Sequence, residues 1–126
     1  TQPLRRTEDI DEALDLFFGS GQKPLVSVSL VDDHPLLVRS IDKHGVLKPL
    51  LNRCSTCRRQ DMPDYYRVNG CIYINRIAEL NHETSFNDNK IPFIMEKEFS
   101  IDIDEENDLG IAEYYMRRIL SAGNNI

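Results

Sequence analysis

Two aspartates near the end of the chain stand two residues apart, in the run Ser100-Ile101-Asp102-Ile103-Asp104. We expect residues 99–103 to form a strand, on which side chains two apart point to the same face, so that Asp102 and Asp104 converge. Carboxylate oxygens suit Mg²⁺, which bridges them to substrate phosphates in phosphoryl or nucleotidyl transfer. The spacing leaves an alternative open, in which Asp104 caps the following helix and Asp102 is solvated.

A second candidate cluster lies in the middle of the chain and contains arginine. Arg59 is followed by Gln60, and Arg67 is followed closely by Asn69-Gly70. Arginine offers planar, bidentate donors to a carboxylate or phosphate, and glycine lets a backbone approach a ligand closely. The cluster therefore predicts a docking site for an acidic sugar. The alternative is a solvated basic loop in which Asn69-Gly70 is an ordinary turn.

The elements that must position these residues follow from local patterns. Apolar residues at helical spacing predict a helix from Thr7 to Gly19, and a second helix from Glu105 to near Gly123. Alternation of apolar and polar residues predicts a strand over residues 25–31, and a β-rich run predicts another over residues 70–74. A short helix is expected over residues 76–80.

A hairpin is predicted between the first strand and the arginine cluster. Residues 36–41 and 46–51 are apolar runs joined by Asp42-Lys43-His44-Gly45, which suits a tight turn. Residues 52–66 are polar and contain Pro63, and so predict an irregular loop. Strands interleaved with helices favour an α/β layer architecture with a hairpin excursion.

Composition excludes several classes of function. The 126 residues suit one compact domain, and the net charge of −6 gives no basic face for nucleic acid. Neither a secretory signal nor an apolar stretch of about 20 residues is present, so we expect a cytoplasmic protein. The odd count of three cysteines predicts free thiols. Cys54 and Cys57 could form half of a zinc site completed by Cys71 or His44, although a lone C-x-x-C pair falls short of four ligands.

Four motifs occur in one order, and together they resemble a known family. They are Gln60-Asp61-Met62-Pro63, Tyr66-Arg67-Val68-Asn69-Gly70-Cys71-Ile72-Tyr73-Ile74, Ser85-Phe86-Asn87-Asp88 and Phe99-Ser100-Ile101-Asp102-Ile103-Asp104. In this order and spacing they resemble the C-terminal motifs of the acylneuraminate cytidylyltransferases, also called CMP-sialic acid synthetases. The opening Thr1-Gln2-Pro3-Leu4-Arg5 is similar to the family segment that leads into a mid-chain helix.

The resemblance implies a role for each of a set of residues. Asp102 and Asp104 match the family's Mg²⁺-binding aspartates, Phe86 matches an aromatic against the sugar, and Thr1 matches the threonine of a Gln-Pro-Thr element. Arg59 and Gln60 match an Arg-Gln pair near the active site and the subunit contact. The sugar-binding segment is matched by Arg67, Asn69, Gly70 and Tyr73.

The resemblance also implies a fold, a reaction and an assembly. The fold is a three-layer, Rossmann-like nucleotidyltransferase sheet, of which residues 1–126 supply the later strands and helices. Residues 34–66 match a projecting hairpin and loop that form a dimerisation arm, so a homodimer is expected. The reaction joins a nonulosonic acid to CMP from CTP and releases pyrophosphate, with Mg²⁺ as cofactor.

One departure from the family pattern limits what this chain should do alone. The family's basic, glycine-containing triphosphate loop has no equivalent in these residues, so we expect a fragment of a longer enzyme that is inactive by itself. A non-catalytic module for oligomerisation or for binding a sugar acid is the alternative. Legionaminic, pseudaminic and deoxyoctulosonic acids are alternative substrates.

Overall fold

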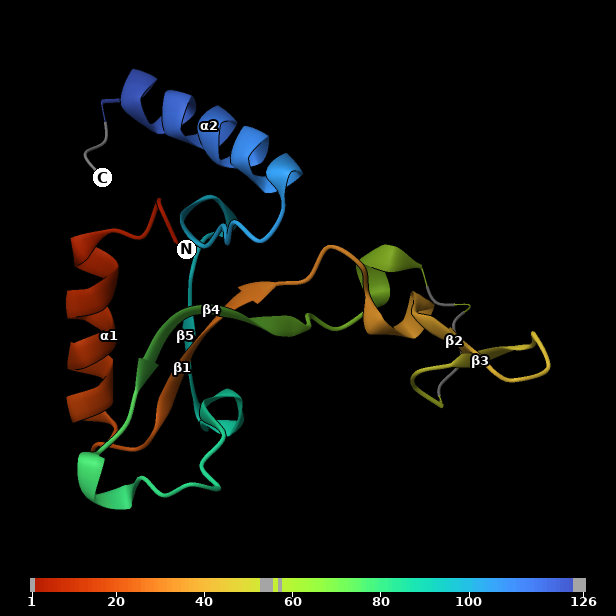
Figure 1. Cartoon of the computed structure of the whole chain (residues 1–126), viewed down its shortest axis with the longest axis horizontal. Helices are drawn as coiled ribbons and strands as arrows, with labels where there is room; N and C mark the ends of the chain where they lie inside the picture. The colour runs from red at the N-terminus through yellow and green to blue at the C-terminus, as the bar shows by residue number, and fades with distance from the viewer. Residues whose placement is uncertain (1, 53–55, 57, 124–126) are drawn as a thin grey trace. The chain divides into compact units, whose positions relative to one another are not determined.

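The computed structural model describes residues 2–52, 56 and 58–123, which divide into two compact units (Figure 1). The first unit runs up to Ser29 and resumes at Val68, and the second unit covers Leu30–Arg67. The predicted hairpin and loop fall within the second unit.

A three-stranded mixed sheet forms the centre of the first unit, within the part of the chain that the structure describes. Strand β1 (Leu25–Leu30) lies between β4 (Tyr66–Ile74) and β5 (Ile91–Ile94). β1 and β5 are parallel, with Leu25 opposite Ile91, whereas β4 runs in the opposite direction (Figure 1). β1 is therefore the central strand, which explains why its residues are buried from Leu25 to Ser29 on both faces.

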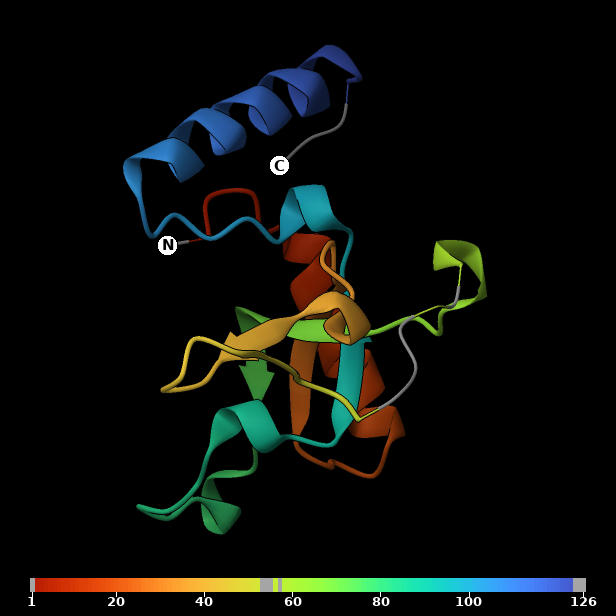
Figure 2. The same cartoon turned by 90° about the vertical axis from the view of Figure 1, so that its right-hand side faces the viewer.

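Two helices pack around this sheet, and both were predicted. Helix α1 (Thr7–Gly19) lies against one face and buries Ala13 and Phe17, and α2 (Glu106–Ser121) lies beyond the end of β5 (Figures 1 and 2). The start of α1 is fixed by Asp9, whose carboxylate accepts the backbone N–H and the guanidinium of Arg6. The sheet and helices agree with the predicted α/β class.

The hydrophobic core of the first unit joins the sheet to both helices. Its buried members come from the segment before α1, from the strands and from the helices: Leu4, Ala13, Phe17, Leu25, Cys71, Ile72, Phe93, Met95, Phe99 and Ile119. Because these side chains belong to segments at both ends of the sequence, the core holds residues 2–19 against β4 and against the chain that follows β5. The candidate site residues stand on these same segments.

The second unit contains the predicted hairpin, with shorter strands than expected. β2 (Arg39–Ile41) pairs antiparallel with β3 (Leu47–Pro49), and Arg39 lies opposite Pro49. Asp42 closes the turn, because its Oδ1 accepts the backbone N–H groups of His44 and Val46. A 3₁₀ turn, η1 (Pro35–Leu37), precedes β2, and another, η2 (Arg59–Asp61), lies in the predicted loop.

The predicted strand over residues 99–103 is wrong. The chain instead forms a 3₁₀ turn, η5 (Lys97–Phe99), and continues without regular structure to the start of α2. The Lys97 carbonyl oxygen accepts both the backbone N–H and the hydroxyl of the buried Ser100, which turns the chain at this point. The strand in this region is β5, eight residues earlier than the predicted start. The argument that Asp102 and Asp104 share a strand face therefore loses its basis.

The remaining elements are short. The helix expected over residues 76–80 is a 3₁₀ turn, η3 (Ile77–Glu79), and another, η4 (Phe86–Asp88), precedes β5. Among the described residues, no helix has the length and apolar character needed to cross a membrane.

Candidate functional site

Gly70 lies at the point where β4 meets the segment that carries Asp102. Its φ is +75°, a backbone conformation that favours glycine. A Cβ atom placed on Gly70 would lie 3.7 Å from Asp102 Oδ2 and 3.7 Å from Gln2 Nε2. The structure thus brings two of the predicted site residues together, and it is the positive φ rather than a lack of space that calls for glycine here.

Asn69 is held by the central strand. It is 7% exposed, and its Oδ1 accepts the Ser27 hydroxyl at 2.6 Å and the Cys71 backbone N–H at 3.2 Å. The Asn69 Nδ2 donor is buried and has no partner among the described residues. Leaving a buried donor without a hydrogen bond lowers the stability of the folded state by about 1–3 kcal/mol. This nitrogen can therefore donate to an acceptor on a ligand or to a water molecule.

Gln2 and Arg5 tie the segment before α1 to β4. Gln2 Nε2 donates to the Asn69 carbonyl oxygen at 3.2 Å, and Gln2 Oε1 accepts the Cys71 thiol at 3.0 Å. Arg5 Nη1 donates to the Cys71 carbonyl oxygen at 2.8 Å. Burial raises the pKa of the Cys71 thiol to about 11. The thiol is therefore neutral at physiological pH and serves as a hydrogen-bond donor rather than as a nucleophile.

Tyr73 and Phe86 form an aromatic pair further along β4. Their ring centroids are 5.9 Å apart, and the Tyr73 hydroxyl donates to Asn87 Oδ1 at 2.8 Å. Tyr73 stands three residues beyond Gly70, which corresponds to about 10 Å along a strand. Phe86 lies in η4, before β5, whereas Asp102 lies after β5. The ring pair and the Gly70–Asp102 approach are therefore two separate parts of the candidate site.

The predicted arginine cluster belongs to the second unit. Arg67 is exposed at the end of that unit, on β4, and Arg59 and Gln60 lie in η2. Thr1, Cys54 and Cys57 fall outside the described residues, so the roles predicted for them stay predictions. His44, the other suggested zinc ligand, lies in the hairpin turn.

The two aspartates are compatible with a metal but do not form a cage. Asp102 is half-buried and Asp104 is exposed, and the described residues contain no group of three or more His, Cys, Asp or Glu side chains that could hold an ion. Mg²⁺ commonly uses one or two carboxylates and completes its coordination with water and substrate phosphates, so each of these carboxylates has the chemistry of a Mg²⁺ ligand. The alternative role for Asp104 as helix cap is wrong, because the N-cap of α2 is Glu105.

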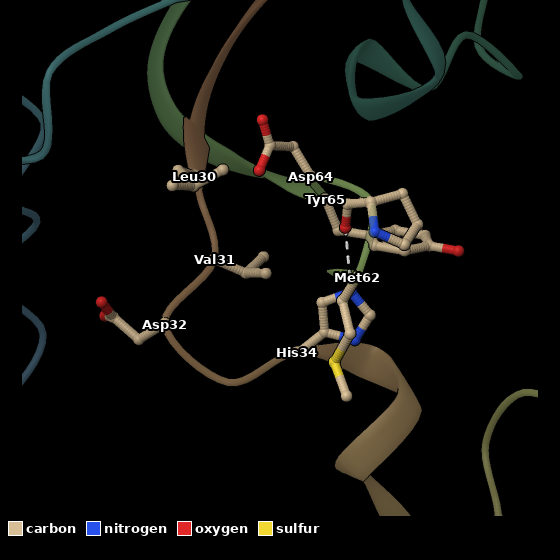
Figure 3. Close-up of a pocket in the computed structure, with 8 residues that line it drawn as sticks. Leu30, Val31, Asp32, His34, Met62, Asp64 and Tyr65 are labelled. Atoms are coloured by element: carbon tan, nitrogen blue, oxygen red, sulfur yellow. Dashed lines mark hydrogen bonds between the residues drawn. The ribbon is translucent and has the colours of Figure 1, made fainter. Parts of the chain in front are cut away.

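A small pocket in the second unit is organised by His34 (Figure 3). His34 Nδ1 accepts the Leu36 N–H at 3.2 Å, so its Nε2 carries the proton and donates to the Pro63 carbonyl oxygen at 2.9 Å. Its ring also meets Tyr65 edge to face, with centroids 4.9 Å apart. Both ring nitrogens are therefore engaged within the second unit, and Nε2 holds the loop that contains Pro63.

Comparison with curated proteins decides which family this site resembles. The chain is 32% identical over 109 residues to the N-acylneuraminate cytidylyltransferase of Streptococcus agalactiae serotype V, and the match covers 86% of the chain. The corresponding proteins of serotypes III and Ia match equally well. The chain is a homologue of the N-acylneuraminate cytidylyltransferases. The resemblance drawn from the four motifs is thereby confirmed.

The match covers only part of each relative. The matched region covers 26% of the length of the Streptococcus agalactiae cytidylyltransferase, so the chain spans about a quarter of that relative. It is also 28% identical over 117 residues to a protein of Campylobacter coli named post-translational flagellin modification protein B, covering 91% of the chain and 49% of that protein. No family model matches the chain.

The sequence of this cytidylyltransferase homologue did not reveal two residues that form hydrogen bonds with Asn69, namely Ser27 and Gln2. Ser27 appeared only as a polar position in an alternating strand, and Gln2 only as a residue next to the threonine of interest. The contacts of both with Asn69 span 42 and 67 residues of sequence. A buried polar side chain in a central strand was the one available signal for Ser27, because such groups need a partner.

Proposed function

We propose that this chain is the acid-sugar-binding and metal-binding part of a cytidylyltransferase, which joins a nonulosonic acid to the α-phosphate of CTP. The observation that carries the proposal is the close approach of Asp102 to Gly70, the residue after Asn69, inside a chain that is homologous to N-acylneuraminate cytidylyltransferases. This arrangement places a carboxylate suited to Mg²⁺ beside a backbone that a ligand can approach closely. The products are the CMP-sugar and pyrophosphate.

Each group contributes by position or by charge. Asp102 and Asp104 would hold Mg²⁺, which when bound neutralises charge on the phosphates. Asn69 Nδ2 donates to an oxygen of the sugar acid, and Tyr73 and Phe86 offer an apolar surface to it. The anomeric hydroxyl attacks the α-phosphorus and loses its proton to solvent, the bond to pyrophosphate breaks, and no covalent enzyme intermediate forms. Catalysis therefore rests on orientation and electrostatics.

The finer features of the enzyme belong to the same proposal. The mixed sheet and its helices are part of a Rossmann-like, three-layer nucleotidyltransferase fold. Arg67 binds the acid, and a homodimer brings the hairpin of one subunit, with the segment of Arg59 and Gln60, near the sugar site of the other. The expected compartment is the cytoplasm. The support for these features is the homology to the N-acylneuraminate cytidylyltransferases.

The test is release of pyrophosphate by the protein at its natural length, with CTP and a panel of acids: N-acetylneuraminic, legionaminic, pseudaminic and deoxyoctulosonic. Asp104→Ala is expected to lower kcat about 100-fold or more while the circular dichroism spectrum is unchanged, because metal-borne charge stabilisation is worth several kcal/mol. Glu106→Gln, an exposed acid in the first turn of α2, is the matched control and should keep its turnover. The 126-residue chain alone is expected to be inactive.

Three results would contradict the proposal in different ways. Unchanged kcat for folded Asp104→Ala at saturating Mg²⁺ would remove that residue from the metal site. Pyrophosphate release by the 126-residue chain would place the triphosphate site within it. Binding of an acid by the natural-length protein without turnover would instead establish a non-catalytic sugar-acid-binding module.

A further inference from the structure

The Ser27 hydroxyl joins the central strand to the motif strand through two hydrogen bonds. It accepts the backbone N–H of Ile72 at 2.7 Å and donates to Asn69 Oδ1 at 2.6 Å. A backbone N–H can only donate, so the hydroxyl accepts from Ile72 and keeps its one proton for the bond to Asn69. Ser27 is fully buried, and its hydroxyl proton is directed to Asn69.

The side-chain amide of Asn69 is consequently fixed in one orientation. The Cys71 backbone N–H also donates to Asn69 Oδ1, at 3.2 Å. Rotating the amide by 180° would set its NH₂ group against the Cys71 N–H, which would place two donors face to face. Because Ser27 and Cys71 both donate to the amide oxygen, the amide nitrogen points away from them. This nitrogen, Nδ2, has no hydrogen-bond partner among the described residues.

We propose that Ser27 is a positioning residue, which fixes the Asn69 amide so that Nδ2 donates to an acceptor oxygen of the bound nonulosonic acid. Candidate acceptors are the carboxylate and hydroxyl oxygens of that acid. The inference rests on the proposed function for the identity of the ligand. The orientation of the amide follows from the hydrogen bonds of this chain alone, so it can be tested separately.

The binding test compares Ser27→Ala with Ser27→Thr in the natural-length protein, by calorimetric titration with the acid that proves to be the substrate. Ser27→Ala is expected to raise the Kd for the acid about 10-fold with the KM for CTP within about twofold, because an uncharged hydrogen bond is removed. Ser27→Thr keeps a hydroxyl and should stay within about threefold of wild type. The double variant Ser27→Ala/Asn69→Ala should bind no more weakly than Asn69→Ala alone, because both changes remove the same contact.

Asn69→Asp separates positioning from folding, in case Ser27→Ala destabilises β4. An aspartate keeps an oxygen that can accept from Ser27 and Cys71, but it has no donor to offer the ligand. It is expected to weaken binding of the acid at least 10-fold at a temperature well below the Tm of the variant, since a carboxylate repels an anionic ligand. Ser29→Ala is the matched control, because Ser29 is buried on the same face of β1 and has no bond to Asn69.

Two readouts separate failure of this inference from failure of the proposed function. In protein labelled with ¹⁵N-asparagine, the Asn69 side-chain NH₂ pair should be a resolved signal that shifts in Ser27→Ala and remains in place in Ser29→Ala. An unshifted pair, or additive losses of binding for Ser27→Ala and Asn69→Ala, would overturn the positioning role. Failure of the wild-type protein to bind any acid of the panel, with the NH₂ pair shifting as expected, would overturn the ligand and retain the fixed amide.

Discussion

Cys71 lies between the segment before α1 and the turn that follows β5. Its thiol donates to Gln2 Oε1 at 3.0 Å and is 3.8 Å from the Phe99 carbonyl oxygen. Burial is the main cause that raises its pKa to about 11, and the guanidinium of Arg5 opposes the rise. The side chain thus contributes to the site as a neutral donor, which links residue 2 to β4 beside Asn69.

The raised pKa of Cys71 predicts how stability depends on pH. The unfolded thiol titrates at about pH 8.5–9, below the folded value of about 11, so the unfolded state loses its proton first. The stabilisation from the protonated thiol is fully present below about pH 8.5 and is lost as the pH rises towards 11. Urea unfolding of wild type and Cys71→Ala between pH 7.5 and 10.5, with reductant, should show a stability difference that shrinks with pH. A difference that stays constant would contradict the assignment, since the other titrating groups are common to both proteins.

Part of the candidate site could be predicted from residue types, and part could not. Asn69, Gly70 and Asp102 were singled out, and Gly70 does lie close to Asp102, although the predicted strand over residues 99–103 does not form. Tyr73 and Phe86 were predicted separately and form a ring contact. Ser27 and Gln2 escaped prediction because their importance lies in hydrogen bonds across the sheet, which local sequence does not encode.

Among the elements, those with a clear local period were predicted and those decided by tertiary contacts were not. Helix α1, helix α2 and strand β1 each carry a period of 3.6 or 2 over several turns or pairs. β5 is four residues long, contains Pro92 and has no clear alternation, and it is defined by its pairing with β1. Residues 99–103 alternate as a strand would, but the turn at Lys97 directs them away from the sheet.

Two glycines in different elements should respond to alanine with opposite signs. Gly70 has a φ of +75°, where a Cβ is strained, so Gly70→Ala should destabilise the protein by about 1–2 kcal/mol. Gly110 lies inside α2, and no atom stands within 4 Å of an added Cβ, so Gly110→Ala should stabilise by about 0.5–1 kcal/mol. Urea unfolding of the natural-length protein measures both. Equal effects of the two changes would mean that β4 relaxes at Gly70, and the close approach of Asp102 would then not depend on glycine.

At the scale of the whole molecule, the second unit has little apolar surface buried within itself. Leu36 is buried, at 6% exposed, and Leu51 is half-buried, but six other large apolar side chains of the hairpin region are exposed: Leu37, Val38, Ile41, Val46, Leu47 and Leu50. A two-stranded hairpin is at best marginally stable in water. Exposed apolar side chains on such a ribbon indicate that it packs against another surface, for which a second copy of the chain is the proposed partner.

A homodimer built on this hairpin is therefore expected for the natural-length protein. Ile41 and Leu47 are opposite each other in the hairpin and 70% and 64% exposed, so Ile41→Glu/Leu47→Glu sets two like charges on the contact and should give a monomer in light scattering at micromolar concentration. Ile77→Glu alters a residue of the first unit that is 87% exposed, and should leave the dimer intact. Because Arg59 and Gln60 belong to the same unit as the hairpin, loss of the dimer should also lower turnover, while each monomer keeps its circular dichroism spectrum. A wild-type protein that is monomeric and active at micromolar concentration would contradict the arrangement, and would favour a hairpin that packs against its own chain.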